Sequence, residues 1–297
     1  GFQNLGSKLS HQTKWEKTIY EVYKDAEVPL QWTDILKSYC DELGITFFTT
    51  PYDLDMVDKL DPYVPAYKIG SGDVAWEAMI DKVASKFKPI FIATGAATMN
   101  EVIRAVEVLN YRRPPGICLM QCNTNYTGDM ENFKYINLNV LKTYKKYFPD
   151  VVLGLSDHTP GHVTVLGAVA LGARAIEKHF TDDTTRSGPD HPFSMDPSSW
   201  REMVDQTRLL EQSLGSTNKE VQDNEKETVV LQRRCIRVNK DIPDQEVITI
   251  EDIEFQRPAP PGSLSPNLVD KILGKPLTGP VSRGEHLTLE HLPRSNG

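Results

Sequence analysis

The sequence predicts an α/β protein, a (β/α)8 TIM barrel joined to a small C-terminal β domain. Two observations support the barrel: apolar runs of strand length alternate with segments of helical period, and polar side chains follow the end of every run. The second domain is predicted by a late change of character, where helical period gives way to short, turn-rich sequence with many prolines.

Six apolar runs have the length of a β-strand. They are residues 45–51, 66–72, 89–95, 117–123, 151–157 and 175–181. Segments of helical period, such as residues 99–110 and 163–173, lie between them. The runs are almost continuously apolar, which is typical of strands that are buried on both faces in a parallel sheet covered by helices.

The polar residues at the strand ends distinguish a barrel from an open sheet. They are Thr49 and Thr50, Ser71 to Asp73, Thr94, Asn123 to Asn125, Ser156 to His158, and His179 to Thr181. An open, doubly wound sheet keeps its site at one switch point, whereas every strand of a barrel delivers side chains to one face. The recurrence of polar ends therefore favours the barrel.

The segment before residue 45 predicts helices and no strand. A short helix is expected over residues 15–23, and a second over residues 29–44 with Gly44 at its carboxyl end. A closed barrel needs eight strands, and six are predicted. The first two β/α units are therefore expected to be absent from this chain.

The boundary between the two domains follows the last predicted helix, residues 198–215. Residues 216–232 are predicted to be a linker and residues 233–297 the second domain. This domain contains an internal echo, because IPDQEVITIEDI at residues 242–253 matches VSRGEHLTLEHL at residues 281–292. The match predicts two turn-strand units related by a two-fold axis.

Composition limits the partners and the compartment. The chain has 297 residues and a formal net charge of −8, so we expect it to bind neither nucleic acid nor an anionic membrane. No apolar run approaches the ~20 residues of a membrane span, and no signal peptide is visible. The four cysteines are expected to be reduced thiols. These features predict a soluble, cytoplasmic protein.

Two histidines at neighbouring strand ends suggest a metal site. With a period of two, Ser156 and His158 share one face of their strand, as do Glu177 and His179, so all four side chains are expected to point inward. Two imidazoles suit a transition metal and leave positions open for substrate, which is typical of a catalytic metal. Either Glu177 or Asp157 is expected to orient a ring.

Lys68 lies within an otherwise apolar strand, AYKIGSGD. It is interpreted as a lysine snorkelling at a sheet edge, as a Schiff-base nucleophile, or as an anchor for a phosphate or carboxylate. The glycines around Ser71 let an anion approach the backbone closely. Asp73 is expected to act as a general base, as the N-cap of the next helix, or as both.

Hydroxyl groups recur at the strand ends, at Thr50, Thr94 and Thr124. Capping could explain each one alone, but their recurrence favours a ligand rich in oxyanions. In the second domain, Arg257 lies on a loop made rigid by prolines, FQRPAPPGS. Such a loop can deliver a guanidinium group to a neighbouring site.

The motifs together resemble a known family. AYKIGSGD, ATG, QCNTNY, GLSDHT, IEKHFTDD, GPDHPFSM and QRPAPPGS occur in that order, and they are similar to those of the sialic acid synthases, which include the legionaminate and pseudaminate synthases. The resemblance covers about residues 15–292. It implies a (β/α)8 barrel and a C-terminal SAF domain similar to type III antifreeze protein.

The resemblance also implies a reaction. The family condenses phosphoenolpyruvate with an N-acetylmannosamine-type aldose and releases phosphate, using a divalent metal, Mn²⁺ with Mg²⁺ or Co²⁺ as alternatives. An N-acetylneuraminate synthase is expected, with legionaminate or pseudaminate synthesis as the alternative. The IGSGD form of the lysine motif is closer to the neuraminate and legionaminate enzymes.

Roles for individual residues follow from the same resemblance. Metal ligands are His158 and His179, and the phosphoenolpyruvate pocket is formed by Thr50, Lys68, Ser71, Thr124 and Ser156. Asp73 takes the general acid/base position. Tyr126 and Asp190 contact the sugar, and Arg257 binds the acetamido group, usually from the partner subunit of a domain-swapped homodimer.

The chain also departs from the family pattern. Many relatives have glutamate at the position of Asp73, some have serine at that of Ala93, and asparagine occurs at that of Thr124. The Glu-Ile-Gly and Lys-Phe-Gln motifs of the first two strands are not found. A polypeptide that began at Gly1 is therefore predicted to be inactive.

Two further functions compete with the metal-dependent synthase. One is a metal-free aldolase that uses Lys68. The other is a non-catalytic sugar-binding protein, which an incomplete barrel would favour.

Overall fold

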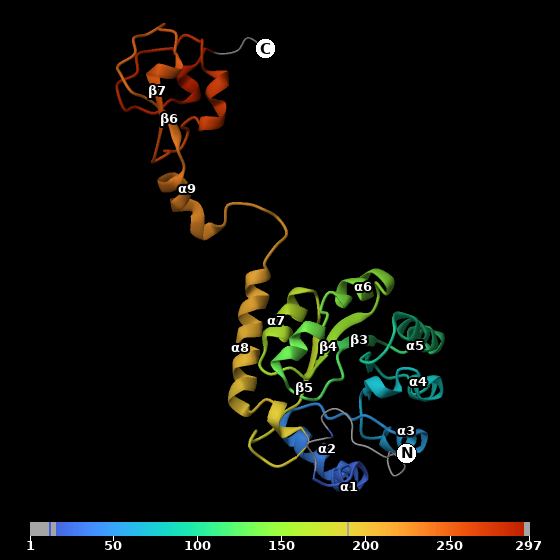
Figure 1. Ribbon diagram of the computed structural model, residues 1–297. Helices are drawn as coiled ribbons and strands as arrows, with labels where there is room; N and C mark the ends of the chain where they lie inside the picture. Colours follow the sequence, from blue (N-terminus) through green and yellow to red (C-terminus); the bar gives the residue numbers. More distant parts are fainter. Residues whose placement is uncertain (1–11, 13–15, 189, 294–297) are drawn as a thin grey trace. The chain divides into compact units, whose positions relative to one another are not determined.

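The computed structural model of the protein describes residues 12, 16–188 and 190–293. The chain divides into two compact units, residues 1–215 and 216–297 (Figure 1). Each unit has its own hydrophobic core. Among the described residues, none of the helices is long and apolar enough to cross a membrane.

The first unit is built around a parallel sheet of five strands in the order β1-β2-β3-β4-β5. The strands are β1 (Tyr67–Ile69), β2 (Ile90–Ala93), β3 (Ile117–Cys122), β4 (Val152–Asp157) and β5 (Ala175–Lys178). All four pairings are parallel and join strands that are consecutive in the sequence. The predicted α/β class is confirmed, and the sheet fits a TIM-like fold.

The sheet is curled. Lys68 of β1 and Glu177 of β5 lie on the two outermost strands, yet Lys68 Nζ is 3.0 Å from Glu177 Oε2. Strands in a flat sheet are ~4.8 Å apart, so the edges of five strands could not meet by their side chains. The inner face is therefore concave, as in the wall of a barrel.

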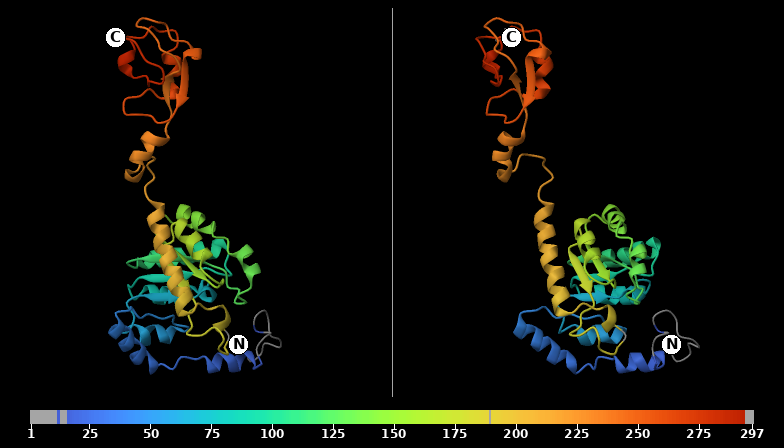
Figure 2. Two further views of the ribbon diagram at one scale, coloured as in Figure 1. Left: turned by 90° about the vertical axis from the view of Figure 1, so that its left-hand side faces the viewer. Right: turned by 60° about the vertical axis from the view of Figure 1, so that its left-hand side comes forward.

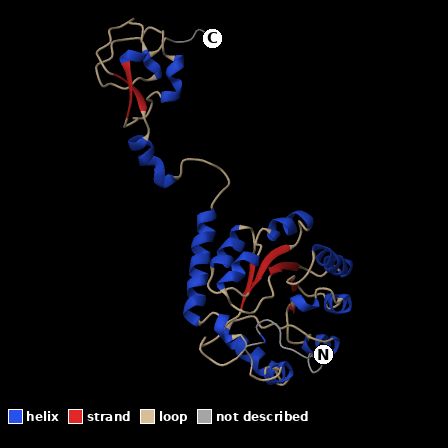
Figure 3. Cartoon of the chain, in the orientation of Figure 1, coloured by secondary structure: helices blue, strands red, loops and turns tan. Residues whose placement is uncertain are grey.

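Helices cover the outer face of this sheet (Figure 3). They are α3 (Leu54–Leu60), α4 (Glu77–Ala84), α5 (Met99–Arg112), α6 (Val140–Tyr147), α7 (Val163–Ala170) and α8 (Pro197–Leu214). Figure 2 shows α8 running along the side of the unit. Local sequence sets the helix starts: Thr98 and Glu101 form a capping box before α5, and Asp196 caps α8 with Pro197 at its first position.

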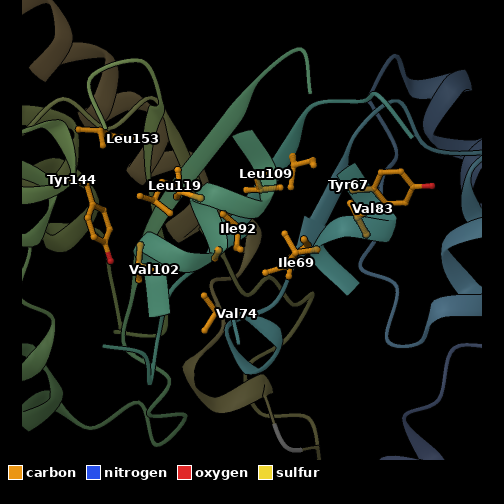
Figure 4. Packing of buried hydrophobic residues seen from close by; sticks show 14 of the residues in the cluster. Tyr67, Ile69, Val74, Val83, Ile92, Val102, Leu109, Leu119, Tyr144 and Leu153 are labelled. Atoms are coloured by element: carbon orange, nitrogen blue, oxygen red, sulfur yellow. The ribbon is translucent and has the colours of Figure 1, made fainter. Parts of the chain in front are cut away.

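Alternation along each strand separates the core from the inner face. Ile69, Ile92 and Leu119 point outward and pack against Val83 and Leu109 of the helices (Figure 4). The opposite face of the sheet carries a smaller set of side chains, Phe91, Ala93, Cys118, Met120, Cys122 and Ala175. The large core lies outside the sheet, which leaves the inner face for polar groups at the strand ends.

The strand predicted over residues 45–51 is wrong. These residues have no regular secondary structure, although the Phe48 ring stacks on Phe91 of β2 at 5.4 Å between centroids. A strand needs a hydrogen-bonded neighbour, and the described chain provides no ladder for this segment. Its apolar composition reflects packing against the inner face.

The helices predicted near the start are confirmed within the described residues. They are α1 (Ile19–Asp25) and α2 (Trp32–Leu43). Gly44 ends α2 in the left-handed conformation, with φ 69°, as expected for a glycine C-cap. Trp15, the first residue of the predicted helix, lies outside the described residues.

The second unit is a small β-containing fold. It contains a two-stranded antiparallel sheet of β6 (Cys235–Val238) and β7 (Ile253–Gln256), and short 3-10 turns pack around it. The segment expected to be a linker includes α9 (Lys226–Gln232). Ala259 N donates to the carbonyl of Val230, which links α9 to the unit that follows.

The two-fold repeat predicted in this unit is confirmed. Ile242 and Val281, which are matched positions of the repeat, exchange both backbone hydrogen bonds at 2.8 and 2.9 Å. Gln245 and Gly284 are also matched, and both have left-handed backbones with φ 65° and 83°. A pair of mutual bonds between equivalent residues is what a two-fold axis requires.

The same symmetry extends to the turns. Thr249 and Asp252 form a capping box around one 3-10 turn, and Thr288 and His291 form one in the matched position. The hydrogen bonds are alike: the Thr249 amide donates to Asp252 Oδ2, and the Thr288 amide donates to His291 Nδ1.

Candidate active site

The two histidines stand side by side at the carboxyl ends of β4 and β5. The parallel ladder ends with the pairs Ser156–Glu177 and Asp157–Lys178, and His158 and His179 follow at the next position. Their ring centroids are 5.1 Å apart. The structure thus brings together the two residues that the sequence suggested as a pair.

His158 has a fixed tautomer. Its Nδ1 lies 2.8 Å from the carbonyl oxygen of Asn123, and because a carbonyl only accepts, Nδ1 carries the hydrogen and donates it. Burial lowers the pKa of His158, so the ring is neutral at pH 7. Nε2 therefore keeps its lone pair, which is the form a metal binds.

His179 is held by a loop that leaves and rejoins the end of β5. The carbonyl of His179 accepts from Met195 N at 2.9 Å, and Thr181 N donates to the carbonyl of Met195 at 2.9 Å. Within this loop, Asp190 Oδ2 lies 3.4 Å from His179 Nδ1, and the Phe193 ring packs 4.9 Å from the His179 ring. The loop thus places a carboxylate beside Nδ1 of His179, on the side of the ring away from Nε2.

The expectation that Glu177 or Asp157 orients a histidine ring through a direct contact is wrong, because the described partners of both carboxylates are other groups. Alternation along the strands sends Asp157 to the outer face, where its carboxylate pairs with Lys178 at 2.7 Å. Glu177 points inward but pairs with Lys68. The groups that orient the rings are instead the backbone of Asn123 and the side chain of Asp190.

Lys68 is an inward-facing cation in the strand wall. Its side chain is 11% exposed, and its ammonium lies 3.0 Å from Glu177 Oε2 and 3.3 Å from the carbonyl of Ile69. A snorkelling lysine would carry its charge into solvent, which this one does not. The ion pair favours a charged group that binds an anion over a nucleophilic amine.

Hydroxyl and thiol groups gather between the ends of β2, β3 and β4. The amide of Gly95 donates to Ser71 Oγ at 2.9 Å. Ser156 is the ladder partner of Cys122, and Ser71 Oγ and the Cys122 thiol both lie beside Gly95. Burial raises the pKa of this thiol. Thr124 packs against Gly95, close to both groups. Three of the expected anion-binding residues therefore lie in one cluster.

Asp73 and Tyr126 are two further expected residues of the first unit. Asp73 lies two residues after Ser71, in the 3-10 turn Ser71–Asp73. Burial raises the pKa of Asp73, which suits a carboxyl group that exchanges a proton near neutral pH. Asp73 does not cap the following helix, because α4 begins at Glu77 with Trp76 before it. The Tyr126 ring lies 4.3 Å from that of His158 and 6.0 Å from that of His179, and burial raises the pKa of its hydroxyl to about 12.

Besides Asp73, two expected residues are not tied to this cluster by a described contact. Thr50 is half-buried at the end of the unpaired residues 45–51. Arg257 belongs to the second unit and is exposed there. Its loop is braced by Arg237, which donates to the carbonyls of Pro258 and Gly284 at 2.8 and 2.7 Å.

Sequence reasoning missed three participants. Cys122 shares a strand face with Met120, and this alternation could have placed its thiol inward. The Asn123 carbonyl and the packing of Phe193 on the histidines had no signal in the sequence, since a backbone oxygen has no residue type and loop packing depends on tertiary structure.

The residues fit a divalent metal bound mainly by the two imidazoles. Both rings have Nδ1 directed at an oxygen, which is the arrangement that orients Nε2 for ligation. The described part of the chain has no group of three or more His, Cys, Asp or Glu side chains placed to hold a metal. Further ligands would therefore be water or substrate, as in an open catalytic site.

The fold and the site define a (β/α)-type domain with its chemistry at the carboxyl ends of parallel strands. The chain belongs to the NeuB family, whose model matches residues 3–219, and a SAF domain model matches residues 233–293. The resemblance to the sialic acid synthases is thereby confirmed, and the chain is a member of this class of synthases.

Individual relatives agree. An uncharacterized protein of Methanocaldococcus jannaschii is 40% identical over 80% of this chain and 70% of its own length. A pseudaminic acid synthase of Campylobacter jejuni is 31% identical over 92% of this chain and 78% of its own. The crystal structure of the N-acetylneuraminic acid (sialic acid) synthetase from Leptospira borgpetersenii superposes with a TM-score of 0.66 at 27% identity, covering 74% of this chain and 76% of that one.

Proposed function

We propose that the protein condenses phosphoenolpyruvate with an N-acetylmannosamine-type aldose to form a nonulosonic acid and phosphate. The observation that carries the proposal is the paired, oriented imidazoles of His158 and His179 beside the cation Lys68 and a cluster of hydroxyls. This combination supports a metal site next to an anion site on one inner face of the sheet. The pseudaminic and N-acetylneuraminic acid synthases among the relatives support the reaction class.

The balance of the reaction assigns tasks to the residues. A carbon–carbon bond forms between the methylene of phosphoenolpyruvate and the aldehyde carbon, water adds to the neighbouring carbon, and the bond to the phosphate oxygen breaks. Lys68, Ser71, Thr124, Ser156 and Thr50 bind the phosphate and carboxylate of phosphoenolpyruvate. Their charges and hydrogen bonds hold the methylene in place for attack.

Asp73 moves the proton. The aldehyde oxygen gains one proton in the condensation and the attacking water loses one, so a single carboxyl group can exchange protons in both steps. The pKa of Asp73 is raised by burial, which brings its protonated form closer to neutral pH. Tyr126 and Asp190 would contact the sugar near the histidines.

The metal, Mn²⁺ in preference to Mg²⁺ or Co²⁺, would be held by His158 and His179 and would polarise the aldehyde carbonyl as a Lewis acid. Neutral Nε2 atoms are the form in which histidine binds such ions.

The substrate and assembly belong to the same proposal. N-acetylmannosamine is the first choice, and the precursors of legionaminic and pseudaminic acids are the alternatives. Arg257 would bind the acetamido group of the sugar from the partner subunit of a domain-swapped homodimer. A panel of acetamido sugars tests the choice of substrate. Arg257→Ala tests the role of the arginine: it should raise KM for the sugar and leave KM for phosphoenolpyruvate unchanged.

The test is phosphate release from phosphoenolpyruvate with Mn²⁺ and each sugar. We expect His158→Ala and His179→Ala to lower the rate at least a hundredfold and to abolish the response to added Mn²⁺, since each removes half of the protein's ligands. His162→Ala is the matched control, because this histidine lies four residues after His158, at the N-cap position of α7. Full activity in both site variants, or in excess chelator, would refute the metal assignment.

A metal-free aldolase using Lys68 is the second candidate. It predicts that borohydride traps the substrate on Lys68 in excess chelator, and such trapping would replace the first proposal. Sugar binding without phosphate release under every condition would instead identify a non-catalytic binding protein.

A further inference from the structure

A buried ion pair lies directly beneath the two histidines. Lys178 Nζ and Asp157 Oδ2 are 2.7 Å apart, and the two side chains are 1% and 0% exposed. They face outward from the sheet, away from the site. Burying such a pair costs several kcal/mol of desolvation per ion, which the attraction between the two charges roughly offsets. The pair therefore adds little net stability, and we expect it to serve another purpose.

Its place in the ladder suggests that purpose. Asp157 and Lys178 form the last register pair of β4 and β5, and the next residue on each strand is a histidine. His158 and His179 therefore stand just beyond the backbone ladder. Beyond the end of the ladder, side chains have to hold the distance between the segments that continue β4 and β5.

The Lys178 ammonium holds both sides of His158. It donates to Asp157 Oδ2 before the histidine and, at 2.6 Å, to the carbonyl of Thr159 after it. Since Lys178 is itself the neighbour of His179, one charged group connects the backbone around both histidines.

The Asp157 carboxylate connects the ion pair to helix α7. Asp157 accepts hydrogen bonds from the Thr159 hydroxyl at 2.8 Å and from the Thr164 hydroxyl of α7 at 2.7 Å. All the members of this network are buried, and every described buried side-chain nitrogen or oxygen has a partner. A fully satisfied network of this kind is rigid.

We infer that the Lys178–Asp157 pair is a positioning device that sets the separation and orientation of His158 and His179 without touching what they bind. The inference rests on the proposed function, because it assigns the pair to the same metal site. Groups that orient metal ligands from behind typically change metal affinity 10- to 100-fold when they are removed.

The test compares three variants of the full chain. Lys178→Met keeps much of the side-chain volume and removes the charge. Asp157→Asn with Lys178→Met removes both charges, so that no buried ion is left alone and the fold is retained. Arg112→Met is the matched control, because it breaks a bidentate ion pair, at 2.6 and 2.7 Å to Asp81, that joins α4 and α5 on the helical side.

Mn²⁺ affinity is measured from the electron paramagnetic resonance signal of the free ion, and stability from thermal unfolding. We expect at least a tenfold loss of affinity in Lys178→Met and in the double variant, with the double variant the more stable of the two. Arg112→Met should bind Mn²⁺ as the wild type does. Wild-type affinity in the folded double variant would overturn the inference.

A second readout needs no metal. In ¹⁵N-histidine spectra, the wild type should show His158 protonated at Nδ1 only, and the double variant should show a mixture of tautomers because the Asn123 contact is loosened. An unchanged His158 tautomer in the double variant would overturn the inference. Wild-type protein that binds no Mn²⁺ would refute the metal assignment of the proposed function, and the tautomer comparison would then decide on the pair alone.

Discussion

Gly95 lies against the cluster of hydroxyl and thiol groups, and a side chain at this position would have no room. A Cβ at this position would lie 2.5 Å from Thr124 Cγ2, 3.0 Å from Ser71 Oγ and 3.1 Å from Cys122 Sγ. The first contact is far shorter than van der Waals packing allows, and the other two are tight. Gly95→Ala should therefore displace Thr124 and strain the cluster, at a cost of about 1–3 kcal/mol for overpacking.

The shortest contact can be removed by itself. Thr124→Ser deletes only Cγ2, so Gly95→Ala should cost less when Thr124→Ser is also present. We expect a coupling energy of at least about 0.5 kcal/mol, which is more than independent sites show. The contacts with Ser71 and Cys122 remain, so the relief should be partial.

Urea unfolding gives the stabilities of the single and double variants, and isothermal titration with phosphoenolpyruvate tests the cluster as an anion site. Gly72→Ala is the control, because a Cβ there meets no heavy atom within 4 Å and should change stability by under about 0.5 kcal/mol. An equal cost for Gly95→Ala with and without Thr124→Ser would refute the packing argument. If Gly95→Ala bound phosphoenolpyruvate as tightly as the wild type, the cluster would not be part of the phosphoenolpyruvate pocket.

Two more predictions use ion pairs. Lys68→Met should weaken phosphoenolpyruvate binding more than tenfold in titration calorimetry and leave Mn²⁺ binding unchanged, because Lys68 is assigned to the anion; equal loss of both would contradict that assignment. The hydrogen bond from Lys240 lowers the pKa of Asp252 in the folded protein. The ionised carboxylate therefore stabilises the fold at pH values above ~3.9, the pKa of aspartate in an unfolded chain, and this contribution is lost as the pH falls below that value. Asp252→Asn should therefore destabilise the protein by about 1 kcal/mol at pH 7, through the weakened cap at Thr249, and the difference from wild type should shrink below pH 4 in unfolding measurements.

Much of the fold could be predicted because the sequence repeats a simple pattern. Strands β1 to β5 and the helices between them follow from apolar runs and from signals such as the Thr98 capping box and Gly44. Residues 45–51 have the same composition as a buried strand, but a strand also needs a paired neighbour, and pairing is a property of the whole sheet. Composition alone could not show that this segment is unpaired.

The site was predictable at the level of residue types and faces. His158 and His179 could be paired because a period of two and consecutive strands fix which side chains share an end of the sheet. The partners of those side chains could not be foreseen, since they depend on which residues meet across the curled sheet. Lys68 meets Glu177 from the opposite edge, and Asp157 is turned away from the ring that it was expected to orient.

The symmetry of the second unit has a consequence for its surfaces and its folding. Strand edges that lack partners invite association with other chains, and in this unit Ile242 and Val281 satisfy each other across the two halves. Neither half on its own would have a partner for these groups. Cutting the chain between residues 258 and 274 and separating the pieces should thus expose complementary edges on both, and the two pieces should be able to reassemble into the intact unit.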